Sequence, residues 1–136
     1  MLLSLFTVVY VKSEKRTQFI DITARVRECL AGSGVREGVA VIYVPHTTAG
    51  ITINENADPS VPRDIIAGLA RLVPESGDYL HAEGNSDAHL KASLLGSSVS
   101  VIIRDGQPLL GTWQGIFFCE FDGPRNRKVW INITGA

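Results

Sequence analysis

The last third of the chain decides the fold. Residues 98–133 read SVSVIIRDGQPLLGTWQGIFFCEFDGPRNRKVWINI, and two turn signals interrupt residues that favour strands. Asp105-Gly106 is typical of a two-residue hairpin turn, and Asp122-Gly123-Pro124 marks a second reversal. We expect strands at Ser98 to Arg104, around Leu109 and Leu110, from Thr112 to Phe121, and from Lys128 to Ile133. Because no helical segment separates them, they are expected to pair as antiparallel sheet.

The first two thirds of the chain add further strands and three helices. Apolar residues recur at helical spacing after Asp21, after Asp58 or Ser60, and after Asn85 or Ser86, all typical N-cap residues. The first helix is expected to end at Gly32 and Gly34, the second before Pro74, and the third at Gly96. Strands are expected at Leu3 to Lys12, Thr17 to Ile20, Val39 to Val44, and Ile51 to Asn54.

Three expectations concern burial. The run from Val39 to Val44 is apolar throughout, which is typical of a central strand covered on both faces. Trp113 is interpreted first as a core residue and only second as a stacking platform for a ligand. A buried stripe is expected on the second helix at Val61, Ile65, Leu69 and Leu72.

The whole chain is expected to form one α+β domain over residues 1–136. About seven strands and three short helices would give a sandwich-like core of antiparallel sheet. A length of 136 residues and a hydrophobic content of 45% suit a single domain with its own core. A doubly wound parallel sheet is excluded, since it needs helices between successive strands.

Charge and cysteine usage limit the partners and the compartment. The net charge is −1 and there is no polybasic run, so nucleic acid and membrane surfaces are not expected as partners. The apolar N-terminus lacks the basic region and the cleavage site of a signal peptide, and we interpret it as the first strand. Cys29 and Cys119 show no metal or redox spacing and are expected to be buried thiols. The sequence therefore predicts a cytoplasmic protein.

Groups that bind metals and phosphates gather in three stretches. Residues 46–59 read HTTAGITINENADP, and His81 and His89 lie in a second polar stretch. Three imidazoles suit zinc or a similar divalent ion better than magnesium, which prefers oxygen ligands. No compact zinc signature is present, so each histidine is alternatively a hydrogen-bonded surface residue. We expect His46, His81 and His89 to converge, and His46 and His89 to take part in catalysis.

Carboxylate, glycine and arginine residues extend the candidate site. Glu55 caps no helix, so it is a candidate ligand or general base, whereas Asp58 is assigned to capping. The helix start at Asn85 and the stretch from Gly111 to Gly115, with Thr112, Trp113 and Gln114, are candidate anion sites. Arg125 and Arg127 are placed to bind a phosphate, or alternatively form a solvated hairpin end.

The stretches HTTAGITINENADP, GNSDAHLKASLLG and LGTWQGIFFCEFDGPRNR closely resemble the YjbQ-like family, also called uncharacterised protein family 0047. The resemblance covers essentially the whole chain and implies a compact homotrimer, an antiparallel α+β fold and a histidine-rich metal site. It places His46, His81 and His89 at that site. The polar positions around them are Thr47, Thr48, Asn54, Glu55 and Asn85, and the C-terminal signature is Gly111, Thr112, Trp113, Gln114 and Arg125. The loop after His81 is shorter than in many relatives, so a more open pocket is expected.

The resemblance also implies an activity. Family members carry the label secondary thiamine-phosphate synthase, a weak condensation of a pyrimidine pyrophosphate with a thiazole phosphate that releases pyrophosphate. A histidine cluster suits diphosphate chemistry imperfectly, which indicates a side activity of a site with another substrate. The alternatives are a metal-dependent hydrolase of a small phosphorylated or acyl compound, with Glu55 as the base, and a non-catalytic trimer that binds a metal or ligand.

Overall fold

The computed structural model describes residues 1–136 and contains eight strands and three helices. The strands are β1 (Leu3–Lys12), β2 (Gln18–Asp21), β3 (Gly38–Tyr43), β4 (Ala49–Glu55), β5 (Ser98–Arg104), β6 (Gln107–Pro108), β7 (Gln114–Glu120) and β8 (Asn126–Gly135). The helices are α1 (Thr23–Ser33), α2 (Ser60–Leu72) and α3 (Ser86–Leu95). Every strand pair is antiparallel, so the predicted α+β class is confirmed.

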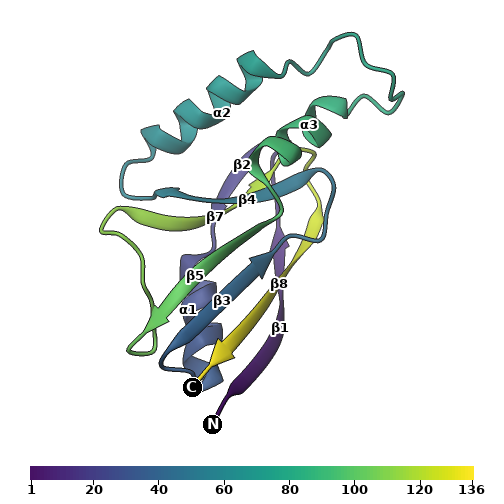
Figure 1. Ribbon diagram of the computed structural model, residues 1–136. Helices are drawn as coiled ribbons and strands as arrows, with labels where there is room; N and C mark the ends of the chain where they lie inside the picture. Colours follow the sequence, from purple (N-terminus) through teal and green to yellow (C-terminus); the bar gives the residue numbers. More distant parts are fainter.

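The strands form two sheets. One has five strands in the order β1-β8-β3-β5-β6, and the other has three in the order β2-β7-β4. Figure 1 shows that α2 and α3 lie at one end of the molecule, while both chain termini lie at the other. The cleft described below is at the end that carries α3, where β8 begins and β3 ends.

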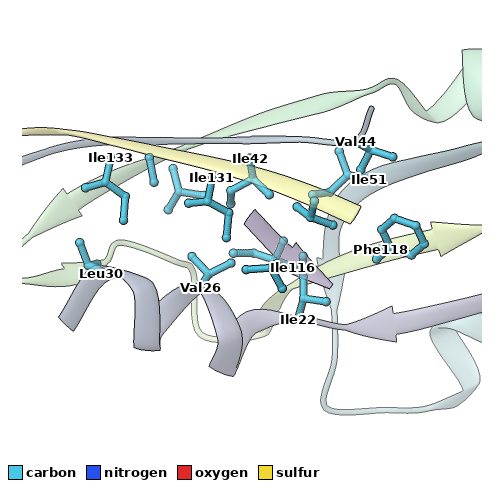
Figure 2. Close-up of a cluster of buried hydrophobic side chains, with 14 of the residues drawn as sticks. Ile22, Val26, Leu30, Ile42, Val44, Ile51, Ile116, Phe118, Ile131 and Ile133 are labelled. Atoms are coloured by element: carbon cyan, nitrogen blue, oxygen red, sulfur yellow. The ribbon is translucent and has the colours of Figure 1, made fainter. Parts of the chain in front are cut away.

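The main core lies between the two sheets and α1. Val26 and Leu30 of α1 extend toward Ile131 and Ile133 of β8, and Ile22, just before the helix, lies beside Ile116, as Figure 2 shows. Side chains from the smaller sheet, including Ile51, Ile116 and Phe118, complete the cluster. Burying side chains of this size contributes about 1.5–3 kcal/mol each.

A second, smaller cluster covers the other face of β7. Phe117, Cys119 and Phe121 pack against Ala88 and Ala92 of α3. Residues of β7 therefore alternate between the two cores, which explains why the strand is buried from Gly115 to Glu120. This packing fixes α3 against the smaller sheet.

Local signals in the sequence act as expected at several boundaries. Asp105 and Gly106 have φ angles of 52° and 72°, as a hairpin turn between β5 and β6 requires. The N-cap of α1 is Ile22 and not the predicted Asp21, although Oδ1 of Asp21 accepts hydrogen bonds from the amide and the hydroxyl of Thr23 at the start of the helix. Gly34, with φ of 74°, ends that helix in the left-handed conformation.

Only β1 and β5 have the predicted limits, and the other strands differ from the predicted ones at one or both ends. The strand expected at Thr17 to Ile20 is shifted by one residue and is β2, Gln18–Asp21. The return strand expected around Leu109 and Leu110 is β6, Gln107–Pro108, because the chain leaves the sheet directly after Pro108.

Three predictions of burial are wrong for the single chain. β3 is central, yet Val39, Val41 and Tyr43 are 37–41% exposed, because nothing covers the outer face of the larger sheet. No residue of α2 is buried, because the helix lies at the rim of the molecule, although Leu69 packs against the second cluster. Trp113 is 63% exposed because it lies in the turn before β7 and not in the strand.

None of the three helices is long and apolar enough to cross a membrane. Cys29 and Cys119 are free thiols, and Cys119 is buried as expected, whereas Cys29 is only partly buried. Burial raises the pKa of the Cys119 thiol far above its ordinary value.

Candidate functional site

A polar cleft of about 450 Å³ lies at the end of the molecule next to α3. Its lining contains all three histidines of the chain, so the predicted convergence of His46, His81 and His89 is present in the structure. No large apolar side chain lines it. The other lining residues are Pro45, Thr47, Thr48, Glu83, Asn85, Asp122, Arg125 and Arg127.

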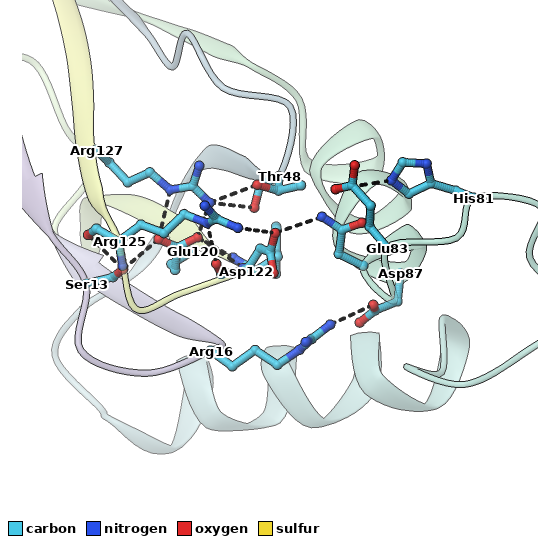
Figure 3. A network of polar contacts seen from close by, with 12 residues as sticks. Ser13, Arg16, Thr48, His81, Glu83, Asp87, Glu120, Asp122, Arg125 and Arg127 are labelled. Carbon is cyan, nitrogen blue, oxygen red and sulfur yellow. Dashed lines mark hydrogen bonds and ion pairs between the residues drawn. The ribbon is translucent and has the colours of Figure 1, made fainter.

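Arg127 and Glu120 form a buried ion pair beneath the cleft (Figure 3). Nε of Arg127 donates to Oε1 of Glu120 at 2.9 Å, and Nη2 donates both to Oε2 of Glu120 and to the hydroxyl of Thr48. The third guanidinium nitrogen, Nη1, has no hydrogen-bond partner in the protein and is not a buried atom. Arg127 is therefore held firmly while one of its donor groups stays available.

Glu120 is fully buried and accepts several hydrogen bonds. Besides Arg127, the hydroxyl of Ser13 donates to Oε1 at 2.6 Å, and the amides of Phe121 and Asp122 donate to Oε2. Burial by itself raises the pKa of this carboxyl, but the hydrogen bonds from Arg127, Ser13 and Asp122 outweigh it and lower the pKa. Glu120 is thus a charged residue at the base of the site.

His46 follows β3 and is oriented by the backbone of β8. The amide of Lys128 donates a hydrogen bond of 2.9 Å to Nε2 of His46. Burial, with a further contribution from the positive charge of Arg127, lowers the pKa of the imidazole. The lowered pKa favours the neutral imidazole, and the hydrogen bond from Lys128 fixes its orientation.

Asp122 links the start of α3 to the loop before β8. Its Oδ2 accepts hydrogen bonds from Nδ2 of Asn85 at 2.9 Å and from Nη2 of Arg125 at 3.1 Å. Burial raises the pKa of Asp122, yet the bond from Asn85 and the charge of Arg125 outweigh this effect and lower it. Oδ1 of Asn85 is buried and has no partner. Arg125 itself is half exposed and available to a ligand.

A second ionic network holds α3 in place. Asp87 accepts from Nζ of Lys91 and from Nη2 of Arg16, both at 2.9 Å, and the carboxylate is 1% exposed. Arg16 also pairs with Glu75 at 3.2 Å, on the loop that carries His81. The second network therefore positions two of the segments that line the cleft.

His81 and His89 lie beside each other. Their ring centroids are 5.3 Å apart and the planes are nearly perpendicular. Nε2 of His81 is 3.7 Å from a carboxylate oxygen of Glu83, on the exposed loop (Figure 3). His89 and His46 also border an adjoining hollow of about 490 Å³.

The arrangement of these side chains does not fit a three-histidine metal centre. No group of three or more His, Cys, Asp or Glu side chains is placed so that it could hold a metal ion. In addition, the lone pair of Nε2 of His46 is already used by the amide of Lys128. The divalent, zinc-like ion thus remains a prediction from the sequence.

Five of the candidate residues lie away from the cleft. β4 and β7 are antiparallel, so Ala49 pairs with Glu120 at one end and Glu55 pairs with Gln114 at the other. The two ends of a seven-residue strand are separated by about 20 Å. The residues outside the cleft are Asn54, Glu55, Thr112, Trp113 and Gln114.

Glu120 and Asp122 were not among the candidates, and Arg127 was considered only together with Arg125. The signal for Glu120 was present, because it follows Ile116 and Phe118 on one face of β7. A charged residue at an inward position requires a buried partner of opposite charge. Asp122 was assigned to a turn, and nothing in its sequence context predicted its contact with Asn85.

Residues 7–136 match the family model described as UPF0047 protein YjbQ-like. The chain belongs to the YjbQ-like family. A UPF0047 protein of Methanocaldococcus jannaschii is 59% identical over 125 residues, which cover 92% of this chain and 91% of that protein. The UPF0047 protein YugU of Bacillus subtilis is 50% identical and covers 92% of this chain and 96% of its own length.

Solved structures show the same YjbQ-like fold. An uncharacterised YjbQ/UPF0047 protein from Clostridium acetobutylicum has a TM-score of 0.92 at 57% identity, covering 93% of this chain and 98% of that chain. A YbjQ-like protein of unknown function from Sulfolobus solfataricus P2 has a TM-score of 0.96 at 32% identity and covers both chains fully. The family assignment made from the three sequence stretches is therefore confirmed.

Proposed function

We propose that this YjbQ-like chain binds a small phosphorylated compound in the cleft and acts on its phosphate or diphosphate group. The observation that carries the proposal is the guanidinium of Arg127, which is fixed by Glu120 and Thr48 and keeps Nη1 available. Arg125 adds a second, half-exposed guanidinium to the same lining. A free guanidinium N–H suits a phosphate oxygen because a hydrogen bond between two charged groups is stronger than one between neutral groups.

The reaction proposed first is the condensation that the family resemblance implies. A carbon–nitrogen bond forms between the thiazole nitrogen and the pyrimidine methylene, while the bond from that methylene to the diphosphate oxygen breaks. Negative charge then develops on the departing pyrophosphate. Donors fixed in advance, such as Arg127, stabilise developing charge without reorganising.

Binding is tested by calorimetric titration with inorganic pyrophosphate. Arg125→Ala is expected to weaken binding about tenfold or more, because it removes a charge-assisted hydrogen bond of about 1.5–3 kcal/mol. Arg104→Ala is the matched control, since Arg104 is a surface arginine on β5 that pairs only with Glu37. Absence of binding to the wild type, or equal loss in both variants, contradicts the proposal.

Catalysis is tested separately with the pyrimidine pyrophosphate and the thiazole phosphate together. Turnover by the wild type that exceeds turnover by His46→Ala supports a transferase. Equal turnover by the two proteins excludes this condensation as an activity of the cleft. Retained pyrophosphate binding without turnover identifies a non-catalytic ligand-binding protein.

The hydrolase alternative has less support. It requires Glu55 as the base, but Glu55 is paired with Gln114 at the far end of β4. A candidate base must lie within hydrogen-bond reach of the proton that it removes. Metal analysis of the purified protein tests the predicted zinc-like ion independently.

We further propose that the chain assembles as a homotrimer in the cytoplasm, as the resemblance implies. The support is the outer face of the five-stranded sheet, hereafter the outer sheet face. Trp130 stacks on Tyr43 and packs edge-to-face on Phe6 there, with little cover from the rest of the chain. Contiguous exposed apolar surface of this kind marks sites of protein association. The apolar residues of the outer sheet face are Phe6, Tyr10, Val39, Val41, Tyr43, Ile102 and Trp130.

A further inference from the structure

The hydrogen bond between Lys128 and His46 determines which ring nitrogen carries the proton. A backbone amide is only a donor, so Nε2 of His46, at 2.9 Å from it, must accept. A neutral imidazole has one protonated and one unprotonated nitrogen. The proton of His46 therefore resides on Nδ1, and the ring presents a donor at that atom.

Nδ1 of His46 has no partner within the protein. It makes no hydrogen bond to another residue, and it is not among the buried polar atoms. His46 lines both the polar cleft and the adjoining hollow. The ring is held in place through Nε2 and presents an accessible donor at Nδ1. This arrangement is suited to binding a ligand.

We propose that His46 is a fixed Nδ1–H hydrogen-bond donor to the ligand of the cleft and not a metal ligand. The identity of that ligand rests on the proposed function. The assignment of the proton to Nδ1 and not to Nε2 does not depend on it. His46 is a ligand-contacting residue whose orientation comes from the backbone of β8.

Coordination of a metal by His46 conflicts with this geometry. A metal needs an unprotonated nitrogen, and the lone pair of Nε2 points at the amide of Lys128. Coordination through Nδ1 moves the proton to Nε2, where it would face another N–H group. Either mode breaks the bond that orients the ring.

Neighbouring donors indicate the chemical class of the ligand. The hydroxyl of Thr48 accepts from Nη2 of Arg127, so its own proton is available to donate elsewhere. Nη1 of Arg127 is likewise available. Three donors, on His46, Thr48 and Arg127, line one cleft, and an oxyanion that only accepts hydrogen bonds matches them.

The tautomer is measured by long-range ¹H–¹⁵N correlation spectroscopy of the full chain labelled at histidine. The expected spectrum shows a pyrrole-type Nδ1 and a pyridine-type Nε2 for His46, assigned with the His46→Ala variant. Addition of zinc chloride is expected to leave both resonances in place. A pyrrole-type Nε2, or a zinc-dependent shift of either nitrogen of His46, overturns the proposal.

Two variants test the donor directly, with inorganic pyrophosphate as the probe. His46→Asn places an amide N–H near the position of Nδ1, and its affinity is expected to stay within about threefold of the wild type. His46→Ala is expected to bind about tenfold more weakly, the loss of a hydrogen bond to a charged group. Equal weakening in both variants overturns the role as donor.

The two proposals fail in different ways. If pyrophosphate does not bind the wild type, the proposed function is wrong, and the spectrum of the free protein still decides the tautomer. If pyrophosphate binds and His46 carries its proton on Nε2, the proposed function stands and the present inference is wrong.

Discussion

Arg127 and Glu120 lie seven residues apart on β8 and β7, and their side chains, 6% and 0% exposed, form an ion pair that solvent hardly reaches. One member borders the cleft and the other is in the interior. The pair thus couples the stability of the fold to the orientation of a guanidinium in the site.

Glu120→Gln is expected to destabilise the protein by about 3–5 kcal/mol, because Arg127 is left as an uncompensated buried charge. Urea denaturation at pH 7 measures the loss. Glu28→Gln is the control, since Glu28 is exposed on α1 and makes no ion pair or side-chain hydrogen bond. A change in Glu120→Gln no larger than in the control contradicts the structural role.

The stability difference between the wild type and Glu120→Gln is expected to depend on pH. The pKa of Glu120 is lower in the folded protein than its ordinary value of 4.5, so the charged carboxylate stabilises the fold above that pH. This contribution disappears as the pH falls through the lowered pKa. The difference in unfolding free energy between wild type and Glu120→Gln should therefore shrink below about pH 4.5. A difference that grows as the pH falls would contradict the lowered pKa of Glu120.

The second ionic network is expected to respond asymmetrically. Asp87→Ala leaves Lys91 buried without its carboxylate and should cost about 3–5 kcal/mol. Lys91→Met should cost less, because Asp87 keeps its bond to Arg16 and a methionine fills a similar volume. Thermal unfolding of both variants checks the order. A larger loss for Lys91→Met would contradict this account of how α3 is held.

Two glycines of the same region should respond to alanine with opposite signs. Gly32 lies in α1, and an added Cβ there meets nothing within 4 Å, so Gly32→Ala should stabilise by up to about 1 kcal/mol. A Cβ at Gly38 would meet the backbone of Thr134 at 2.1 Å, so Gly38→Ala should destabilise the pairing of β3 with β8. Denaturation midpoints measure both changes. Stabilisation by Gly38→Ala would show that this contact is not as close as the structure has it.

Assembly through the outer sheet face is tested by Trp130→Glu. A charge introduced between Phe6 and Tyr43 should convert the trimer into a monomer, because burying an unpaired carboxylate is unfavourable. Sedimentation velocity measures the mass of the particle. Trp113→Glu is the control, since Trp113 is exposed outside that face and should leave the assembly unchanged. A monomeric wild type, or dissociation by the control, contradicts the proposed interface.

The sequence predicted the β-strands best where local pattern and turn chemistry agree. β1 and β5 have the predicted limits, because alternation and the Asp105-Gly106 turn define them. The apolar stripe of α2 is also real, but periodicity shows which face is apolar and not what covers it. The apolar run of β3 likewise did not show that its outer face lacks a covering element.

The candidate site was predicted in part. His46, His81 and His89 line one cleft as expected, since His46 follows β3, His81 precedes α3 and His89 lies within α3. Glu55 was grouped with His46 because the two are near each other in sequence. β4 separates them by its full length, and only the antiparallel register with β7 reveals that distance.

The atom that orients His46 belongs to the main chain. Position 128 can consequently carry any side chain except proline and still supply the same N–H, so substitutions there leave the imidazole tautomer untouched. A mutational scan of residue 128 would therefore find that ligand binding tolerates every substitution except proline. Lys128→Pro removes the backbone N–H, so it alone would reveal that this position is needed to orient His46.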